Sequence, residues 1–244
     1  MQLFFEKKDL KDNKLTLSTE KFHYLSRVKR IQKGEKIAII IHQTHYTIII
    51  NKIDANYLYF NTLEKKPVIP KKLDITLIQC LPKYNKMDTI IDQVTQLGVS
   101  QIYPIESERS IVKWTQTKKE KQRQRWQMMS LRASQQSEQQ QVPIIYPIQP
   151  IHEFYNEFKK TEYDYYIVPW ESESKQTLKS YLKRIAIQKN YKIAVLIGPE
   201  GGISNSEINQ LKTLKFNPLS LGAHIYKTEI AGLITISQLI YELS

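Results

Sequence analysis

The chain has 244 residues, a length that indicates one large domain or two small ones. Hydrophobic residues make up 41% and charged residues 25%, and this composition excludes a disordered chain. Its formal net charge of +12 favours an anionic partner, and nucleic acid before membrane. The lone Cys80 excludes an internal disulfide and suits a reducing compartment. Because residues 1–10 are already charged and no apolar run reaches membrane-spanning length, we expect no signal peptide, no membrane segment and a cytoplasmic protein.

The first seventy residues are predicted to form a small, basic, β-rich domain. The apolar runs Lys36–Ile41 and Tyr46–Ile50 flank a hairpin turn at residues 42–45, and Asn56–Asn61 continues the β pattern. Thr19–Lys29 favours a short helix. This part holds 13 Lys/Arg against 7 Asp/Glu, which is half of the excess positive charge. The segment 64–72, with two prolines and four lysines, is predicted to be a linker.

After residue 72 the pattern changes to alternating strands and helices. Leu73–Leu81 and Ile102–Ile105 favour strands, and between them apolar residues recur at the 3.6-residue spacing of a helix. That helix would begin near Asn85 or Asp88 and end at Gly98. A strand–helix–strand unit of this length predicts a parallel pair of strands and an α/β sheet. Further predicted elements are the basic helix Lys118–Gln136, the strands Tyr165–Val168 and Leu219–Leu221, a helix ending near Lys215 and the closing helix Thr228–Leu243.

The centre of the second part is a strand, a glycine-rich turn and a helix start. The run Ile193–Ile197 favours a buried strand, and it stops at a Gly198-Pro199 turn. Ser204 and Glu207 have the spacing of a capping box, which opens a helix. Three predicted strand ends, at residues 168–170, 197–202 and 221–223, lie at the carboxyl edge of the parallel sheet, where such sheets bind ligands. The sequence therefore predicts a ligand site at these three turns.

Several common ligand motifs are absent from the sequence. There is no G-x-x-x-x-G-K-[ST] and no G-x-G-x-x-G, which removes the usual support for nucleotide hydrolysis and dinucleotide redox chemistry. No G-x-S-x-G supplies a nucleophile elbow. His42 and His45 lack further ligands at metal spacing, so a solvated turn is preferred for them and no metal is expected.

Two C-terminal motifs carry a resemblance to a known family. Residues 197–204 (Ile-Gly-Pro-Glu-Gly-Gly-Ile-Ser) and 219–231 (Leu-Ser-Leu-Gly-Ala-His-Ile-Tyr-Lys-Thr-Glu-Ile-Ala) resemble the 16S ribosomal RNA uridine N3-methyltransferases of the knotted SPOUT class. The chain departs from the family pattern at Gln96, within residues 132–139 and at His224–Lys227, where Lys227 stands in place of the usual arginine. Further matching blocks lie at residues 23–25, 28–30, 34, 75–83, 86–88, 96–99, 104–110, 136–137 and 142–143.

The resemblance implies an α/β fold with two domains. It implies a SPOUT-type parallel-sheet domain with a C-terminal trefoil knot over residues 71–244, and a smaller PUA-like RNA-binding β-barrel over residues 1–70. It also implies S-adenosylmethionine as cofactor, 16S rRNA of the small ribosomal subunit as partner, and a homodimer whose site is completed across the interface. The residues that the resemblance places at the cofactor are Pro169, Ile197, Gly198, Pro199, Gly201, Gly202, Leu221, Gly222, Ile225 and Tyr226.

Methyl transfer to uridine N3 needs an in-line approach and loss of the imide proton. Glu200 or Glu229 would accept that proton or orient the base, and Lys227 would stabilise the charge developing on the uracil oxygens. Each has a plainer alternative: Glu229 could only favour the start of the closing helix, and Lys227 could only touch phosphate. The expected RNA contacts, any of which could be an ordinary solvated charge, are Arg27, Arg30, Lys83, Lys86 and Arg109.

Two other functions stay open at the level of sequence. One is a knotted methyltransferase with a different RNA target, suggested by the altered block at residues 132–139. The other is a non-catalytic RNA-binding or ribosome-assembly factor of the same fold.

Overall fold

A computed structural model describes residues 2–158, 161–185 and 190–244. The chain divides into two compact units, one made of Met1–Pro70 with Ser134–Gln141, and the other of Lys71–Ala133 with Val142–Ser244. Ser134–Gln141 joins the first unit through contacts such as the hydrogen bond from Ile69 N to Gln140 Oε1, 3.1 Å long. Such a contact between distant segments has no local sequence signal. The division into an RNA-binding domain up to residue 70 and a methyltransferase domain from residue 71 stays a prediction.

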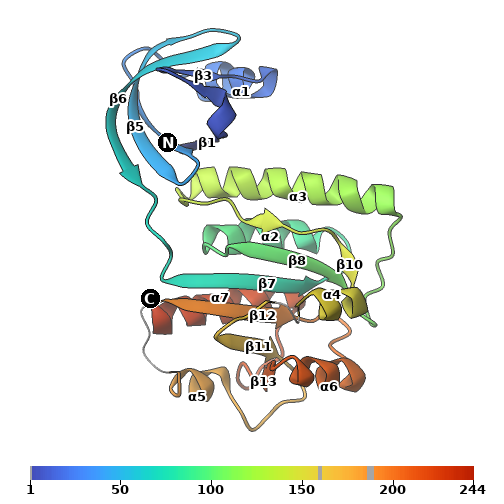
Figure 1. Cartoon of the computed structure of the whole chain (residues 1–244). Helices are drawn as coiled ribbons and strands as arrows, with labels where there is room; N and C mark the ends of the chain where they lie inside the picture. The colour runs from blue at the N-terminus through green and yellow to red at the C-terminus, as the bar shows by residue number, and fades with distance from the viewer. Residues whose placement is uncertain (1, 159–160, 186–189) are drawn as a thin grey trace. The chain divides into compact units, whose positions relative to one another are not determined.

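The first unit is built on a curled six-stranded sheet that forms a half-barrel (Figure 1). Its strand order is β1-β4-β5-β6-β3-β2, in which β1 and β4 run parallel and the other neighbours antiparallel. Register shifts between β5 and β6 add to the curvature. The elements are β1 (Gln2–Phe5), the 3-10 helix η1 (Lys7–Asp9), β2 (Leu10–Lys11), β3 (Lys14–Thr16), α1 (Thr19–His23), the π-helix η2 (Tyr24–Val28), β4 (Lys36–Ile41), β5 (Thr44–Ile53) and β6 (Tyr57–Pro67).

The predicted hairpin is confirmed, with a tighter turn than expected. Ile41 pairs with Thr44, so His42 and Gln43 alone form the loop. Both have positive φ angles, 42° and 60°, as a type I′ turn requires. The predicted linker is wrong over residues 64–67, because β6 continues there against β5 and places Pro67 opposite Thr44 at the end of the ladder, where a missing N–H is tolerated.

The core of the first unit lies on the concave face of the half-barrel. Leu15, Ile39, Ile48 and Leu58 are fully buried on successive strands of the sheet. The predicted helix at residues 19–29 is present as α1 followed by η2, and Ser18 caps it by accepting a hydrogen bond from Lys21 N. Apolar residues at alternate strand positions therefore explain this sheet.

The second unit is a seven-stranded parallel sheet covered by helices on both faces. The strand order is β10-β8-β7-β12-β11-β13, and β9 pairs with β8. This confirms the predicted α/β class. The elements are β7 (Leu73–Cys80), α2 (Lys86–Gln96), β8 (Gln101–Glu106), α3 (Gln116–Gln136), β9 (Ile144–Ile145), β10 (Gln149–Pro150), α4 (Ile151–Phe158), β11 (Tyr165–Pro169), α5 (Leu178–Leu182), β12 (Tyr191–Ile197), α6 (Asn205–Thr213), β13 (Asn217–Leu219) and α7 (Thr228–Leu243).

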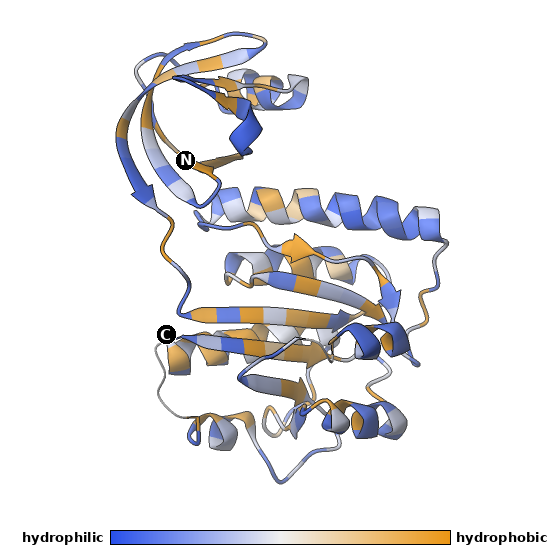
Figure 2. Ribbon diagram, in the orientation of Figure 1, coloured by the Kyte–Doolittle hydropathy of each residue, from blue (hydrophilic) through white to orange (hydrophobic). Residues whose placement is uncertain are grey.

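Two apolar cores lie on opposite faces of this sheet. In β12, Ile193, Val195 and Ile197 pack in the core that contains α2 and α7, whereas Ala194 and Leu196 pack in the core that contains α4 and α6. The sheet is therefore apolar on both sides, as buried parallel sheets are. Figure 2 shows the apolar strands and α7, in contrast with the hydrophilic first half of α3.

Some element boundaries differ from the prediction. β13 begins at Asn217 and ends at Leu219, earlier than the predicted Leu219–Leu221, because its partner β11 supplies hydrogen bonds as far as Pro169. The short helices α4 and α5 were not predicted, although the buried residues Ile151, Phe154, Tyr155 and Phe158 have helical spacing in α4 and Thr177 caps α5. Among the described helices, none combines the length and apolarity needed to cross a bilayer.

Candidate active site

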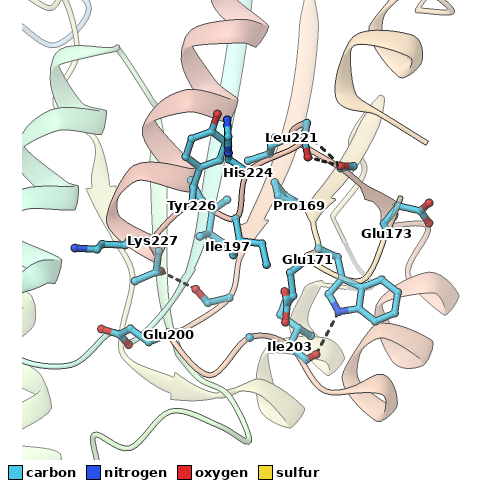
Figure 3. Close-up of a pocket in the computed structure, with 18 of the residues that line it drawn as sticks. Pro169, Glu171, Glu173, Ile197, Glu200, Ile203, Leu221, His224, Tyr226 and Lys227 are labelled. Carbon is cyan, nitrogen blue, oxygen red and sulfur yellow. Dashed lines mark hydrogen bonds between the residues drawn. The ribbon is translucent and has the colours of Figure 1, made fainter. Parts of the chain in front are cut away.

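Three loops of the second unit meet at the carboxyl end of its sheet. β12, β11 and β13 are neighbours in that order and run parallel, so the loops that follow them lie side by side. Residues of these loops, at 169–177, 197–203 and 220–228, line a cleft of about 910 Å³ (Figure 3). This volume lies within the range of about 300–1,000 Å³ that is usual for small-molecule sites. The cleft is where the sequence predicts a ligand.

The turn after β12 needs glycine at two positions for steric reasons. A Cβ atom on Gly198 would lie 2.7 Å from Ile203 Cγ1, which is too close for any side chain. Gly202 has a φ angle of +71°, and a Cβ atom there would lie 1.9 Å from Glu171 Oε1. The predicted capping box is confirmed: Ser204 Oγ accepts from Glu207 N, and the Glu207 carboxylate accepts from Ser204 N. The turn is thus fixed by its own backbone and by the start of α6.

A buried hydrogen-bond chain ties this turn to α7. Thr228 Oγ1 donates to Gly198 O at 2.6 Å, and it accepts from Gln79 Nε2 at 3.0 Å. Gln79 Nε2 also donates to Cys80 O at 3.0 Å. Gln79 is fully buried on β7 and Thr228 is 5% exposed. The position of Gly198 therefore depends on a hydroxyl that lies thirty residues later in the chain.

The loop between β13 and α7 lines the cleft. Residues 223–226 line the cleft, and in the described part of the chain their N–H and C=O groups make no hydrogen bond. Gly222 has a φ angle of +120°, and a Cβ atom there would meet nothing within 4 Å, so its backbone conformation and not its small size requires glycine. Unpaired backbone groups on a cleft wall can recognise the polar edge of a ligand.

A cluster of three charged side chains lies beside the glycine turn. Lys86 Nζ lies 2.8 Å from Glu200 Oε1 and 3.4 Å from Glu229 Oε2. The backbone N–H of Lys83 donates to both carboxylate oxygens of Glu200, at 3.0 and 3.1 Å. Burial favours the neutral form of Glu200, but the hydrogen bonds from Lys86 and from Lys83 N–H outweigh it and lower the pKa of Glu200. The hydrogen bond to Glu200 raises the pKa of Lys86.

The charged groups that line the cleft are mostly acidic. They comprise Glu171, Glu173 and Glu200 against Lys227. A cleft with this excess of carboxylates suits a cationic ligand. Among the residues that the structure describes, no group of three or more His, Cys, Asp and Glu side chains is arranged to hold a metal ion.

The structure places the predicted site residues as follows. All of the predicted cofactor residues line the cleft, together with Glu200 and Lys227. Glu229 does not line it and faces Lys86 instead. Arg109 lies beside the glycine turn, since its Nη1 donates to Gly201 O at 2.9 Å. Arg27 and Arg30 are exposed in the first unit. The roles of these residues stay predictions.

Sequence reasoning missed several residues of the cleft. Glu171 lies over Gly202, and Thr228 holds Gly198. Glu171 follows the predicted strand end at residues 168–170, and Thr228 lies within the motif at residues 219–231, so proximity to the predicted turns is a signal that could have found both. Gln79 lies in the matching block at residues 75–83, but a glutamine in an apolar strand shows its purpose only when its partner is known.

Comparison with known proteins shows the family of the chain. Residues 70–240 match the family of the RNA methyltransferase domain. A protein of Bacillus subtilis (strain 168), "Ribosomal RNA small subunit methyltransferase E", is 27% identical over 93% of this chain and 90% of its own length. A protein of the same name from Aquifex aeolicus (strain VF5) is 30% identical, over 86% of this chain and 87% of its own.

A solved structure shares the fold over the full chain. The Ribosomal RNA small subunit methyltransferase E from Neisseria gonorrhoeae, bound to S-adenosyl methionine, superposes with a TM-score of 0.82 at 24% identity. The match covers 100% of this chain and 98% of that one. This structure shows the shared fold, and the family match over residues 70–240 places the chain among the RNA methyltransferases. More narrowly, the chain belongs to the ribosomal RNA small subunit methyltransferase E family.

Proposed function

We propose that this chain uses S-adenosylmethionine to methylate N3 of a uridine in 16S rRNA. The observation that carries the proposal is the cleft, in which three turns at the ends of adjacent parallel strands meet the start of α7. The names of its relatives support a substrate in the small ribosomal subunit. The cofactor in the Neisseria gonorrhoeae structure supports S-adenosylmethionine.

The residues of the cleft fit this cofactor. Its sulfonium and amino groups are cationic, and the cleft carries the carboxylates of Glu171, Glu173 and Glu200. The unpaired backbone groups of residues 223–226 suit the polar edge of a purine, while Ile197 and Leu221 offer apolar contact. When bound, the cofactor supplies an electrophilic methyl group.

The remaining chemistry falls to side chains at the cleft edge. Lys227 is exposed there and, within the described residues, pairs with no carboxylate, so its ammonium is free to stabilise charge on a uracil oxygen. Glu200 has a lowered pKa and is a weak base, so we assign it to orientation of the target. Glu229 does not line the cleft, and its Oε2 lies 3.4 Å from Lys86, so we assign it to support of the Lys86–Glu200 pair and not to direct proton transfer.

Further parts of the proposal concern partners. Arg27, Arg30, Lys83 and Arg109 would contact RNA phosphates. A second copy of the chain would complete the site, and exposed apolar residues of α7 such as Tyr241, at 86% exposure, offer a surface for it. Sedimentation at several concentrations tests the dimer. The trefoil knot that the sequence resemblance implies also stays a proposal.

The decisive experiment is a nucleoside analysis of 16S rRNA. A deletion strain is complemented with the wild-type gene or with Lys227→Ala, and the digested rRNA is analysed by mass spectrometry. Loss of one N3-methyluridine on deletion, restored by the wild type, is the expected result. Loss of a different modified nucleoside would indicate another RNA target. An unchanged set of nucleosides would indicate a non-catalytic assembly factor.

A further inference from the structure

Lys86 joins three segments that are far apart in the sequence. It is the first residue of α2, Glu200 lies in the turn after β12, and Glu229 lies in the first turn of α7. The three side chains are 30%, 22% and 20% exposed, so each is largely enclosed by the others and by their loops. The ammonium is therefore a bridge between the glycine turn and the start of α7.

This arrangement is unfavourable for an RNA contact by Lys86. One of its donors is taken by Glu200 at 2.8 Å, and Glu229 lies 3.4 Å away. One cation between two carboxylates leaves a net negative cluster, which repels a phosphate. Lys86 would have to leave both partners to reach RNA, and the two carboxylates would then face each other without a counter-charge.

We propose that Lys86 is a positioning residue, which holds the Glu200 carboxylate in place at the cleft and bridges it to Glu229 at the start of α7, and does not itself touch RNA. The inference deepens the proposed function and rests on it for the meaning of the two acids. It replaces the RNA contact expected for Lys86 from the sequence. The geometry assigns the backbone of Lys83 a supporting role, since its N–H donates to both Glu200 oxygens.

The direction of the pH effect follows from the pairing. The folded-state pKa of Glu200 is lowered, so this carboxylate stabilises the fold above its unfolded-state pKa, and that stabilisation is lost as pH falls through the folded-state pKa. Removal of the Lys86 charge raises the folded-state pKa of Glu200, so the stabilisation by this carboxylate is lost at a higher pH. The other charged or titratable groups on the segments around Glu200 are Lys83, Tyr84, Asp88, Arg109, Lys227 and Glu229.

The test uses the full-length protein without cofactor or RNA in its first arm. Carboxyl ¹³C NMR follows the titration of Glu200, which is assigned by comparison with Glu200→Gln. We expect Lys86→Met to move the Glu200 midpoint to higher pH and Lys86→Arg to restore it, because arginine keeps the charge. Because no methyl transfer is measured, this arm stays valid even if the chain proves to have no methyltransferase activity.

The second arm measures RNA affinity against salt concentration, with Lys83→Met as the matched variant. Lys83 is three residues away and contacts Glu200 only through its backbone, so its substitution removes the same charge from the same segment. Because Lys83 is a proposed phosphate contact, Lys83→Met is expected to reduce the magnitude of the slope of log affinity against log salt by about 0.7–0.9. Lys86→Met is expected to leave the slope unchanged.

Two results would overturn the inference. The first is a Glu200 midpoint that stays in place in Lys86→Met, and the second is a salt slope that falls in Lys86→Met as it does in Lys83→Met. If Lys86→Met does not fold, Lys86→Gln takes its place, because it also removes the charge: a Glu200 midpoint that stays in place there contradicts the inference, and one displaced to higher pH supports it. Single-turnover rates against pH add the functional readout, where Lys86→Met should shift the acidic limb upward.

Discussion

Replacement of Thr228 by valine tests the link between α7 and the glycine turn. Valine has nearly the shape of threonine and lacks the hydroxyl, so the change removes two hydrogen bonds without creating a cavity. It leaves Gly198 O and one Gln79 N–H unpaired, in a place where Gln79 is fully buried and Thr228 is 5% exposed. A buried group that loses its partner costs about 1–3 kcal/mol. We expect the free energy of unfolding to fall by about 2–4 kcal/mol, allowing for partial relaxation of the two groups.

The assay is urea unfolding, with calorimetric titration of S-adenosylmethionine on the same variants. Thr228→Ser is the matched control, because it keeps the hydroxyl and loses one methyl group, which costs about 1 kcal/mol. Cofactor affinity should fall in Thr228→Val and stay near the wild-type value in Thr228→Ser, since only the former frees Gly198. A double-mutant cycle with Gln79→Leu should be non-additive, because the double variant leaves fewer unpaired groups than the two single variants together.

The reasoning would be refuted by a Thr228→Val variant within about 0.5 kcal/mol of the wild type, the range of surface substitutions away from such features. It would also be refuted if serine cost as much as valine, since packing and not hydrogen bonding would then explain the effect. If Thr228→Val is destabilised but binds the cofactor as tightly as the wild type, the hydrogen-bond chain stabilises the fold and does not contribute to cofactor binding.

Three further predictions concern the cleft and the first unit. Gly202→Ala forces a side chain to a φ angle of +71° and toward Glu171, so unfolding measurements should show a loss of about 1–2 kcal/mol and calorimetry a weaker cofactor complex. Lys227→Ala should lower single-turnover rates by roughly a hundred- to a thousand-fold at saturating RNA with little change in cofactor affinity, whereas a loss of RNA affinity alone would make the residue a phosphate clamp. Arg27→Ala combined with Arg30→Ala should flatten the salt dependence of RNA binding and spare cofactor affinity; an unaltered slope would show that these side chains are only solvated.

The parts of the fold that the sequence predicted well have strong local signals. The strand, turn and helix at residues 193–213 combine an apolar run, a Gly-Pro turn and a capping box, and each of these acts within a few residues. The closing helix was predicted with its observed bounds, Thr228–Leu243. Convergence of three turns could also be predicted, because parallel strands must end at one edge of the sheet.

The parts that were missed depend on partners elsewhere in the chain. The Pro- and Lys-rich residues 64–67 resemble a linker until β5 is known to lie alongside them. β1 joins its sheet by pairing with β4, more than thirty residues later. In the site, Lys86 was predicted to contact RNA, because the two carboxylates that enclose it are more than a hundred residues away in the sequence. Local patterns thus predict which turns form the cleft, and only the folded chain reveals which charges are already neutralised.

The position of α7 has a consequence for the order in which this protein matures during synthesis. Its first residue secures the glycine turn, and the helix packs against α2, β7, β12 and α5, all of which precede it in the chain. A nascent chain can therefore complete the β12 turn and still lack a competent cleft until α7, Thr228–Leu243, has emerged and docked. Cofactor capture is thereby expected to depend on the docking of α7 onto elements that precede it in the chain.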